Sequence, residues 1–530
     1  MCNDTYIWWK HGLVYHIYVK SFFDSNNDGI GDLKGITLKL DYLCELGMDA
    51  IWLSPVYPSA HYDGGYDITD YKAIDPQFGN MDDFDELLSQ CHSRGIKLIL
   101  DLVMNHTSHL HPWFIESRSS LNNPKRDWYI WNQKKNNWFS FFGGSAWTFD
   151  KTTKSYYLHS FLKEQPDLNW RNEEMAEAFF GNIRFWLDKG VDGFRLDVIN
   201  VIAKDFRLRP NPRVFKIPFF QKVKYNINRK YCFNIIEKLR TLVDTYDDRL
   251  IIGEIYMLPP GKSKRVLSFV TKNKKRLHLA FDFSLTFKKF DAGTYYKYLN
   301  KWNKYKESAE GVSMVLSNHD LGRHINRNPF RLHKTQKAKI EIMYLLTSFA
   351  TPFIYYGDET GMRNISVPKN KITDPLGIKF WPFYSGRDKY RTPMQWDMSK
   401  NAGFSTDEPW LAIDKEFKNR CVEYQKNIPD SIFNLYNTLI RIRKKYKALH
   451  MGTWIPFIKG TNGVLAYHRL YESEEVLVIL NFRNKKTDIK LPDLNHYEIL
   501  VDTTALAHIG LAQESITINP FHGLVLLKQN

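Results

Sequence analysis

The chain has 530 residues, of which 43% are hydrophobic and 15% aromatic, so it can build a large core and is not a disordered protein. Its net charge of +16 would suit nucleic acid, but the basic residues are scattered in short runs and are not interleaved with aromatic residues as in a nucleic-acid groove. We therefore interpret the charge as a basic solvated surface and expect no nucleic-acid partner. Five cysteines without a CxxC motif exclude a disulfide scaffold.

The sequence carries no signal for export or membrane insertion. The N-terminus, MCNDTYIWWKHG, lacks a basic region followed by an apolar stretch. The longest charge-free stretch, residues 342–357, is too short to span a bilayer. We expect a soluble, cytoplasmic monomer without a membrane partner.

Short apolar segments rich in β-branched residues alternate with amphipathic segments along most of the chain. The helical segments are 36–46, 81–94, 175–189, 231–246 and 337–349. The predicted strands are 14–19, 50–53, 97–103, 193–198, 250–256, 279–283, 313–317 and 352–356. Strands that alternate with helices indicate a parallel sheet, and eight such units predict a closed (β/α)8 TIM barrel, formed by residues 1–104 and 174–450.

Two regions depart from this alternation. About ninety residues separate the third predicted strand from the fourth, which is too long for a structureless loop, so we predict a small inserted domain at 105–173. After a helix at 431–446, the segments 464–469, 476–482, 497–501 and 523–527 read as strands with no helices between them. They predict a C-terminal antiparallel β-sandwich at 451–530.

Three acidic residues follow three of the barrel strands. They are Asp197 in GFRLDV, Glu254 in IIGEIY and Asp320 in LSNHD. One acid after a strand is usually a helix cap, but three acids beside Arg, His or Asn at one barrel face suggest an active site. When carboxylates lie close together, the pKa of one is raised, so that one stays protonated as an acid while another is ionised. A retaining glycosidase requires such a pair. Neither a HExxH metal motif nor a GxSxG nucleophile motif competes.

These segments resemble the conserved regions of the α-amylase family, glycoside hydrolase family 13. DLVMNHTS (101–108), GFRLDVIN (193–200), GEIY (253–256) and SNHD (317–320) occur in the family's order, and QPDLNW (165–170) matches a fifth region. YRTPMQWD (390–397) and NAGFS (401–405) are typical of its α-glucosidase and oligo-1,6-glucosidase group. The resemblance covers nearly the whole chain.

The resemblance implies three catalytic residues. Asp197 would be the nucleophile, Glu254 the general acid and then base, and Asp320 the group that grips the 2- and 3-hydroxyls of the sugar. Arg195, two residues before Asp197 on the same strand face, would keep the nucleophile ionised.

Further residues are expected to bind the sugar. Tyr66 would stack under the ring, and Asp67 with Arg391 would hold its non-reducing end and close the pocket behind one glucose. For Arg391 the rival in the same segment is Arg387. The remaining substrate-binding residues implied by the resemblance are His106, Gln165 and His319.

A second motif, DSNNDGIGDLKG at 24–35, alternates oxygen-bearing side chains around two glycines. Asp24, Asn26, Asp28 and Asp32 suit a hard divalent cation, although no Glu follows at the twelfth position as in an EF-hand. The resemblance implies a structural Ca²⁺ or Mg²⁺ here, with the carbonyl of Ile30 as a further ligand. The alternative is a solvated acidic turn.

We predict an exo-acting retaining α-glucosidase that cleaves short α-glucosides, with a lean toward α-1,6 bonds. In the group that the chain resembles, Val at the position after the nucleophile, here Val198, is typical of enzymes that cleave α-1,6 bonds. The segments 374–382 and 208–212 instead resemble those of α-glucosidases that cleave α-1,4 bonds. Alternatives in the group are a trehalose-6-phosphate hydrolase and a sucrose- or maltose-type α-glucosidase; no RLDRD-like motif follows Arg323 to indicate a sucrose isomerase. The non-enzyme alternative is a glucosidase-like accessory protein of a transporter, which would need a membrane segment.

Overall fold

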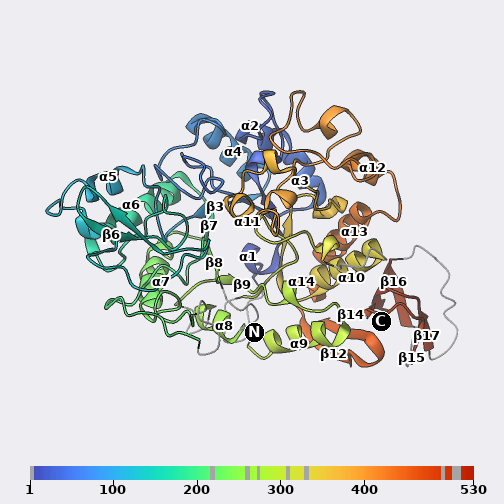
Figure 1. Ribbon diagram of the computed structural model, residues 1–530. Helices are drawn as coiled ribbons and strands as arrows, with labels where there is room; N and C mark the ends of the chain where they lie inside the picture. Colours follow the sequence, from blue (N-terminus) through green and yellow to red (C-terminus); the bar gives the residue numbers. More distant parts are fainter. Residues whose placement is uncertain are drawn as a thin grey trace.

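The computed structural model describes residues 5–214, 221–256, 263–270, 275–305, 311–327, 333–490, 496–503 and 515–529. In this part of the chain, eight parallel strands follow one another around a central axis in the order β10-β11-β1-β2-β3-β7-β8-β9 (Figure 1). Ser313 Oγ on β10 donates to the carbonyl of Ala280 on β9 at 2.9 Å, so the two end strands also meet. The predicted (β/α)8 barrel is confirmed. Its strands are β1 (Val14–Ile17), β2 (Ala50–Leu53), β3 (Lys97–Leu102), β7 (Gly193–Leu196), β8 (Leu250–Glu254), β9 (Leu279–Phe281), β10 (Ser313–Val315) and β11 (Thr351–Tyr355).

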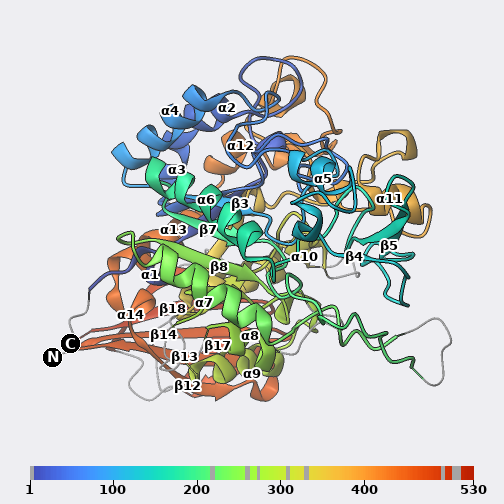
Figure 2. The same ribbon diagram turned by 90° about the vertical axis from the view of Figure 1, so that its left-hand side faces the viewer.

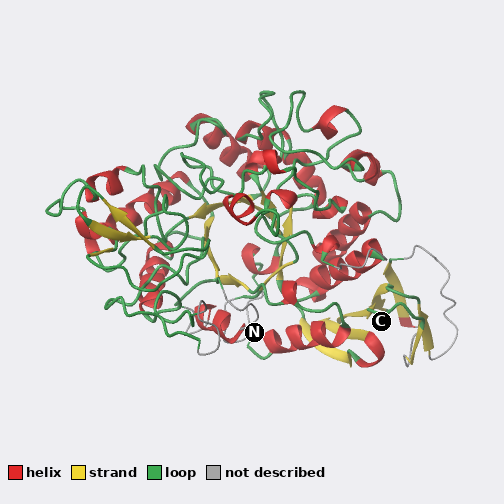
Figure 3. Ribbon diagram, in the orientation of Figure 1, coloured by secondary structure: helices red, strands yellow, loops and turns green. Residues whose placement is uncertain are grey.

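Helices surround this ring of strands (Figure 3). The longer ones are α3 (Leu40–Leu46), α4 (Met81–Ser93), α6 (Glu173–Lys189), α7 (Tyr231–Val243), α8 (Ser263–Val270), α9 (Ala292–Asn303), α10 (Lys334–Thr347) and α13 (Ile432–Lys445). The shorter ones are α1 (Trp8–His11), α2 (Leu33–Leu38), α5 (Pro112–Ser117), α11 (Pro375–Phe380), α12 (Val422–Lys426) and α14 (Lys447–His450). The predicted single helix at 36–46 is two helices, because Lys39 between them leaves the helical conformation at φ −106° and ψ 8°. Among the described residues, no helix combines the length and apolarity needed to cross a membrane.

Helix α6 shows how local sequence signals place a catalytic strand. Asn172 caps its first turn by accepting from the N–H of Met175, and Gly190 ends it in the left-handed conformation at φ 103°. Its buried face includes Trp186, whose indole N–H donates to the carbonyl of Tyr71 at 2.7 Å. The chain then turns directly into β7, which leads to Asp197.

The interior of the barrel changes character from one end to the other. Its N-terminal end is filled by an apolar cluster: Trp8, Trp9, Val14, Ala50, Trp52, Ile99, Leu250, Ile252, Leu279, Phe281, Val315 and Phe353. Two residues further along three strands, the inward positions become His16, Asp101 and Glu254, and Asp101 lies in register with Arg195 on β7. The charged side chains therefore gather at the C-terminal ends of the strands, where barrel active sites lie.

The segment between β3 and α6 forms a small antiparallel sheet of its own. Its strands are β4 (Trp131–Asn132), β5 (Trp147–Asp150) and β6 (Ser155–Leu158), in the order β4-β6-β5. Asp167 joins this insert to the barrel, since it accepts from Asn105 Nδ2 at 2.9 Å and pairs with Lys204 Nζ at 3.0 Å. All three side chains are buried.

The C-terminal region is antiparallel, as predicted, and lies below the barrel in Figure 2. Its five-stranded sheet has the order β12-β13-β14-β18-β16, and β15 pairs with β17 as a second sheet. Buried side chains of both sheets, such as Ile479 and Ile516, form one apolar cluster between them. Its strands are β12 (Thr453–Lys459), β13 (Val464–Tyr471), β14 (Glu474–Asn481), β15 (Thr487–Lys490), β16 (Tyr497–Asp502), β17 (Ser515–Ile518) and β18 (Gly523–Lys528). The domain boundaries at 104, 173 and 450 stay predictions.

Candidate active site

Arg195 is the centre of the charged layer at the strand ends. Its Nη1 lies 2.7 Å from Asp101 Oδ1 and 2.8 Å from Asp197 Oδ1, and its Nη2 pairs with Glu254 Oε2. All four side chains are buried. One guanidinium therefore holds the predicted nucleophile and the predicted acid side by side, each from a different strand end.

Three carboxyls around one guanidinium cannot all ionise easily. Burial raises the pKa of Asp197 well above its usual value, and the nearby carboxylates of Glu254 and Asp101 raise it further, while Arg195 opposes the rise. Burial likewise raises the pKa of Glu254, and that of Asp101 to about 6. Arg195, the charge expected to keep Asp197 ionised, is shared with Asp101 and Glu254. The raised pKa values favour a proton kept among these carboxyls, which is the state that a general acid requires.

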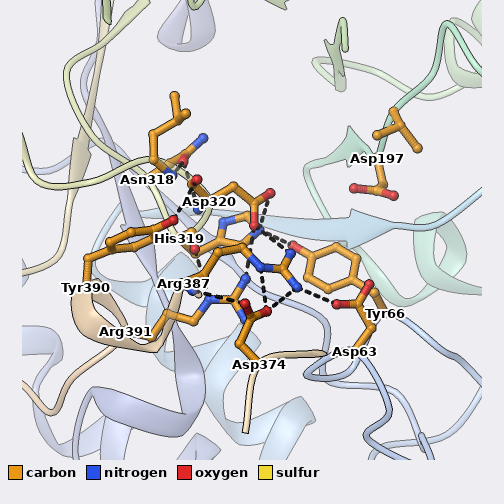
Figure 4. Close-up of polar contacts among 12 residues, drawn as sticks. Asp63, Tyr66, Asp197, Asn318, His319, Asp320, Asp374, Arg387, Tyr390 and Arg391 are labelled. Atoms are coloured by element: carbon orange, nitrogen blue, oxygen red, sulfur yellow. Dashed lines mark hydrogen bonds and ion pairs between the residues drawn. The ribbon is translucent and has the colours of Figure 1, made fainter. Parts of the chain in front are cut away.

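A second buried arginine, Arg387, joins three further carboxylates (Figure 4). It lies 2.6 Å from Asp63 Oδ1, 3.0 Å from Asp320 Oδ1 and 2.6 Å from Asp374 Oδ1. Although burial favours the neutral acid, the positive charges of Arg387 and Arg391 together with His319 hold the pKa of Asp320 far below its usual range. Asp320 is therefore an ionised acceptor, unlike the proton-retaining group around Arg195.

The structure places two of the predicted sugar-binding residues behind the cavity wall. Asp67 is fully buried, and its Oδ1 accepts from Ser59 Oγ at 2.9 Å and from the N–H of Asp63 at 3.2 Å. Arg391 donates to the carbonyl of His319 and to Asp320 Oδ1, both at 2.9 Å. Neither residue lines the cavity, whereas Asp63 and Arg387 do. In both pairs, the residue at the cavity lies four positions earlier in the sequence.

The other predicted residues converge around the same layer. Tyr66 Oη donates to Asp101 Oδ2 at 3.0 Å and lies 2.7 Å from His319 Nε2. His106 lines the cavity, and burial lowers its pKa to about 4, so its ring is neutral at pH 7. Gln165 lies behind it, with Nε2 3.1 Å from His106 Nε2 and 3.2 Å from Asp63 Oδ2.

These groups line one end of a cavity of about 320 Å³. Asp63, Tyr66, His106, Asp197, Glu254, Asp320 and Arg387 are its polar end. Most of the remaining lining side chains are apolar and come from the insert, from the segments after β7, β8 and β9, and from the region of α11.

Sequence reasoning missed Asp63, Asp374 and the support role of Asp101. DGGYD contains two aspartates four residues apart, and SGRDKYR contains two arginines four residues apart, so the spacing alone cannot choose between them. The signal for Asp374 was available, because Asp-Pro before a short helical pattern is a helix N-cap; here its side chain accepts from the N–H of Gly377.

The acidic loop at 24–32 is folded upon itself. Asp24 accepts the N–H groups of Asn26, Asn27 and Gly29, and Asp32 accepts those of Ser25 and Gly35. Burial raises the pKa of Asp32, and the charge of Asp24 adds to the rise. In the described part of the chain, no three His, Cys, Asp or Glu side chains converge as a metal site would require. The loop has the oxygen donors that a hard cation prefers, among them the amide of Asn26 and the carbonyl of Ile30.

Comparison with known proteins agrees with this geometry. The catalytic-domain model of the alpha-amylase family matches residues 16–452, and the model of the alpha-amylase SusG C-terminal domain matches residues 464–525. The chain belongs to the alpha-amylase family. The family predicted from the sequence motifs is thereby confirmed.

Relatives within the family are named after their action on 1,6-linked glucosides. An oligo-1,6-glucosidase of Parageobacillus thermoglucosidasius is 38% identical, with 92% of each chain covered. A glucan 1,6-alpha-glucosidase of Streptococcus pneumoniae is 36% identical, with 95% of this chain and 96% of the relative covered. Among solved structures, an alpha-glucosyl transfer enzyme has a TM-score of 0.91 at 33% identity, covering 99% of this chain and 100% of that chain. An isomaltulose synthase of Erwinia rhapontici, solved with sucrose, has a TM-score of 0.88 at 33% identity with both chains fully covered.

Proposed function

We propose that this glycoside hydrolase is a retaining, exo-acting α-glucosidase that releases glucose from short α-glucosides, with a preference for α-1,6 bonds. The observation that carries the proposal is the pairing of Asp197 and Glu254 with one guanidinium at the polar end of the cavity. Because both carboxyls lie within reach of Arg195, the spacing suits direct attack on the sugar rather than a water held between two distant carboxyls.

In the first step, Asp197 attacks C1 of the glucose from one face while Glu254 gives its proton to the glycosidic oxygen. The C1–O bond breaks, the aglycone leaves as an alcohol, and a covalent β-glucosyl ester forms on Asp197. Asp320 remains ionised beside Arg387 and Arg391, so it can accept hydrogen bonds from the sugar hydroxyls as positive charge develops on the ring.

In the second step, Glu254 acts as a base. It takes a proton from water, the oxygen of that water attacks C1, and the ester bond to Asp197 breaks to release α-glucose. Because two inversions occur at C1, the configuration of the substrate is retained.

The Asp63–Arg387 pair supports action on a terminal glucose. The two side chains lie 2.6 Å apart, both are buried, and both line the cavity next to Asp320. They would bind the hydroxyls at the non-reducing end and leave no room for a further sugar behind it. This assigns to Asp63 and Arg387 the role that the sequence suggested for Asp67 and Arg391.

Val198 is the residue on which the α-1,6 preference can be tested. It lines the cavity beside Asp197. The Val198→Thr variant keeps the shape but adds a hydroxyl that could bind a more closely held α-1,4-linked sugar. We expect the isomaltose-to-maltose ratio of kcat/KM to fall roughly five- to tenfold, the effect of about one hydrogen bond. A constant ratio would place linkage choice elsewhere.

The function itself is tested by following products. The purified protein is incubated with isomaltose, maltose, sucrose, trehalose and trehalose 6-phosphate, and glucose release and its anomer are followed by NMR. We expect the most rapid glucose release from isomaltose, and α-glucose as the first anomer released from sucrose or trehalose. Because isomaltose and maltose also release a reducing-end glucose that is already a mixture of anomers, retention is read from the non-reducing substrates, and initial release of β-glucose from sucrose or trehalose would refute it. A preference for trehalose 6-phosphate would favour the alternative predicted above.

We further propose that the protein is a cytoplasmic monomer, that nucleic acid is not among its partners, and that the 24–32 loop binds a structural Ca²⁺ or Mg²⁺. Asp24, Asn26, Asp28, Asp32 and the carbonyl of Ile30 would hold the ion, which would neutralise the crowded charge of the loop.

A further inference from the structure

We propose that the outer part of the active-site cavity accepts an apolar aglycone, so that kcat/KM rises with the length of an alkyl leaving group, whereas a further sugar unit adds little. This inference rests on the proposed glucosidase function and concerns the group that leaves. It is drawn from the side chains that line the cavity beyond its polar end.

One wall of this outer part is a continuous apolar surface. Phe141 and Phe142 of the insert both pack against Phe161, with ring centroids 5.5 and 5.4 Å apart. Phe141 also packs edge-on against Tyr256, beyond β8, at 5.0 Å. Val198 and Leu376 belong to the same cluster, so side chains from four separate segments form one wall.

The rest of the outer lining is apolar as well. It contains Phe283 and Phe287, which follow β9, and Leu321, which follows Asp320. Phe287 is 55% exposed although it lines the cavity, so its ring has apolar surface available for a ligand. Together with Phe283 and Leu321 it adds apolar surface to the cavity lining.

The described part of this outer lining offers few polar partners. Apart from the tyrosine hydroxyls, its uncharged polar side chains are Ser284 and Asn318. Asn318 Oδ1 already accepts the N–H groups of Asp320 and Leu321, at 2.9 and 2.7 Å. A second hexose placed here would lose hydration of several hydroxyls without replacing their hydrogen bonds, which is unfavourable.

The apolar surface continues outside the cavity. Leu376 and Tyr384 line the cavity, and the segment between them exposes Ile378, Phe380, Trp381 and Phe383, the last with 97% of its surface accessible. Lys379 Nζ fastens this segment to the insert by donating to the carbonyls of Phe142 and Gly143 at 2.8 and 2.7 Å. A hydrocarbon chain leaving the cavity would therefore still run along apolar side chains.

The test compares two substrate series on the intact enzyme. The alkyl series is methyl, propyl and butyl α-D-glucoside, in which every leaving group is a simple alcohol, and the sugar series is isomaltose and isomaltotriose. We expect kcat/KM to rise about tenfold from methyl to butyl, because a fully buried methylene contributes roughly fourfold and the cavity mouth is partly open. From isomaltose to isomaltotriose we expect less than a twofold change.

Variants locate the effect on the cavity. Phe287→Ser and Leu376→Ser, from two separate segments of the lining, should each lower the butyl-to-methyl ratio of kcat/KM several-fold. Phe457→Ser removes an aromatic ring of 40% exposure in the C-terminal region and should leave the ratio unchanged. Equal kcat/KM for methyl and butyl glucoside, or a larger gain in the sugar series, would overturn the inference while leaving the glucosidase function intact. Absence of glucose release from every substrate would instead refute the proposed function.

Discussion

At the scale of single residues, the site contains two groups of buried carboxylates whose pKa values are shifted in opposite directions, one around Arg195 and one, Asp320, beside Arg387 and Arg391. Arg195 is shared among Asp101, Asp197 and Glu254, whose pKa values are all raised, chiefly by burial. The negative charges of these carboxylates repel one another at the place where the reaction needs an acid and a base close together. The catalytic carboxyls should therefore lower the stability of the protein that they serve.

Asp197→Asn is expected to abolish turnover and raise stability. A carboxyl whose pKa is raised on folding stabilises the protein at low pH and loses that contribution as the pH rises from its unfolded toward its folded pKa. At pH 7 the buried charge is therefore unfavourable, and an amide of the same shape removes it. We expect activity below about one per cent of wild type and a melting temperature higher by a few degrees at pH 7, with the gain shrinking toward pH 4.

Activity is measured on isomaltose and stability by thermal unfolding across this pH range. The exposed Asp41→Asn variant serves as the control, because its carboxylate lies on the surface. A lower melting temperature for Asp197→Asn at pH 7 would contradict the charge-crowding account, and substantial residual turnover would contradict the role of nucleophile.

Asp374 positions Arg387 without lining the cavity. It accepts from Arg387 Nε at 2.7 Å and from the N–H of Gly377 at 3.1 Å, where it caps α11. Asn is an equally good N-cap, so Asp374→Asn keeps the helix start but removes the negative charge and replaces the oxygen that accepts from Arg387 Nε by an NH2 group. Since a hydrogen bond to a charged group contributes about 1.5–3 kcal/mol, we expect KM for isomaltose to rise about tenfold with a smaller change in kcat. A fall in kcat at constant KM would assign Asp374 to the chemical step instead.

At the scale of elements, the end of α10 is completed by side chains from elsewhere in the chain. Arg443 on α13 donates to the carbonyls of Leu346, Ser348 and Ala350, and Arg469 on β13 donates to that of Thr347. Both arginines are fully buried among carbonyl oxygens. They satisfy the last turn of α10, whose carbonyls have no partner within the helix, and so tie a barrel helix to the C-terminal sheet.

Arg443→Ala should destabilise the fold strongly. The substitution leaves several buried carbonyls without donors, each of which costs about 1–3 kcal/mol, so we expect the free energy of unfolding to fall by about 3 kcal/mol or more. Arg441→Ala on the same helix is the matched control, because Arg441 is exposed, and should change stability by less than about 0.5 kcal/mol. The measurement is urea unfolding of both variants. Equal unfolding midpoints for Arg443→Ala and Arg441→Ala would contradict the prediction and show that water replaces the lost donors.

At the scale of the whole molecule, the 24–32 loop joins the beginning of the barrel to a segment near its end. The N–H of Asp24 donates to the carbonyl of Phe404 at 3.1 Å, and the N–H of Trp410 donates to that of Gly29 at 3.0 Å. An ion bound in this loop would therefore hold together two parts of the chain that lie nearly four hundred residues apart in sequence. Its effect should be seen in global stability more than in turnover.

Chelation is accordingly expected to lower the melting temperature. A ligand that binds only the folded state stabilises it by about 2.7 kcal/mol at a hundred times its Kd. We expect EDTA to lower the melting temperature by several degrees, Ca²⁺ or Mg²⁺ to restore it, and kcat at 25 °C to stay nearly constant. Metal analysis of the purified protein and the Asp28→Asn variant provide the controls. A melting temperature indifferent to EDTA, with no bound metal, would favour the solvated acidic turn.

The sequence by itself determined the barrel and the place of its three acids. Alternating strand and helix patterns predict parallel strands, and parallel strands bring their C-terminal ends to one rim, so Asp197, Glu254 and Asp320 had to lie near one another. The predicted end of the fourth strand, at residue 198, was two residues too late, since β7 ends at Leu196. Val198 has a positive φ of 35°, a backbone conformation that ends a strand.

Only the tertiary structure decided which loop residues reach the cavity. Asp63 and Asp67, like Arg387 and Arg391, are identical in type and four residues apart, and the path of each loop presents the first and buries the second. The apolar outer wall likewise joins Phe141, Val198, Tyr256 and Leu376 from four distant segments. Local sequence patterns encode strand and helix periodicity, but loop paths are set by long-range packing and by buried ion pairs, which no local pattern records.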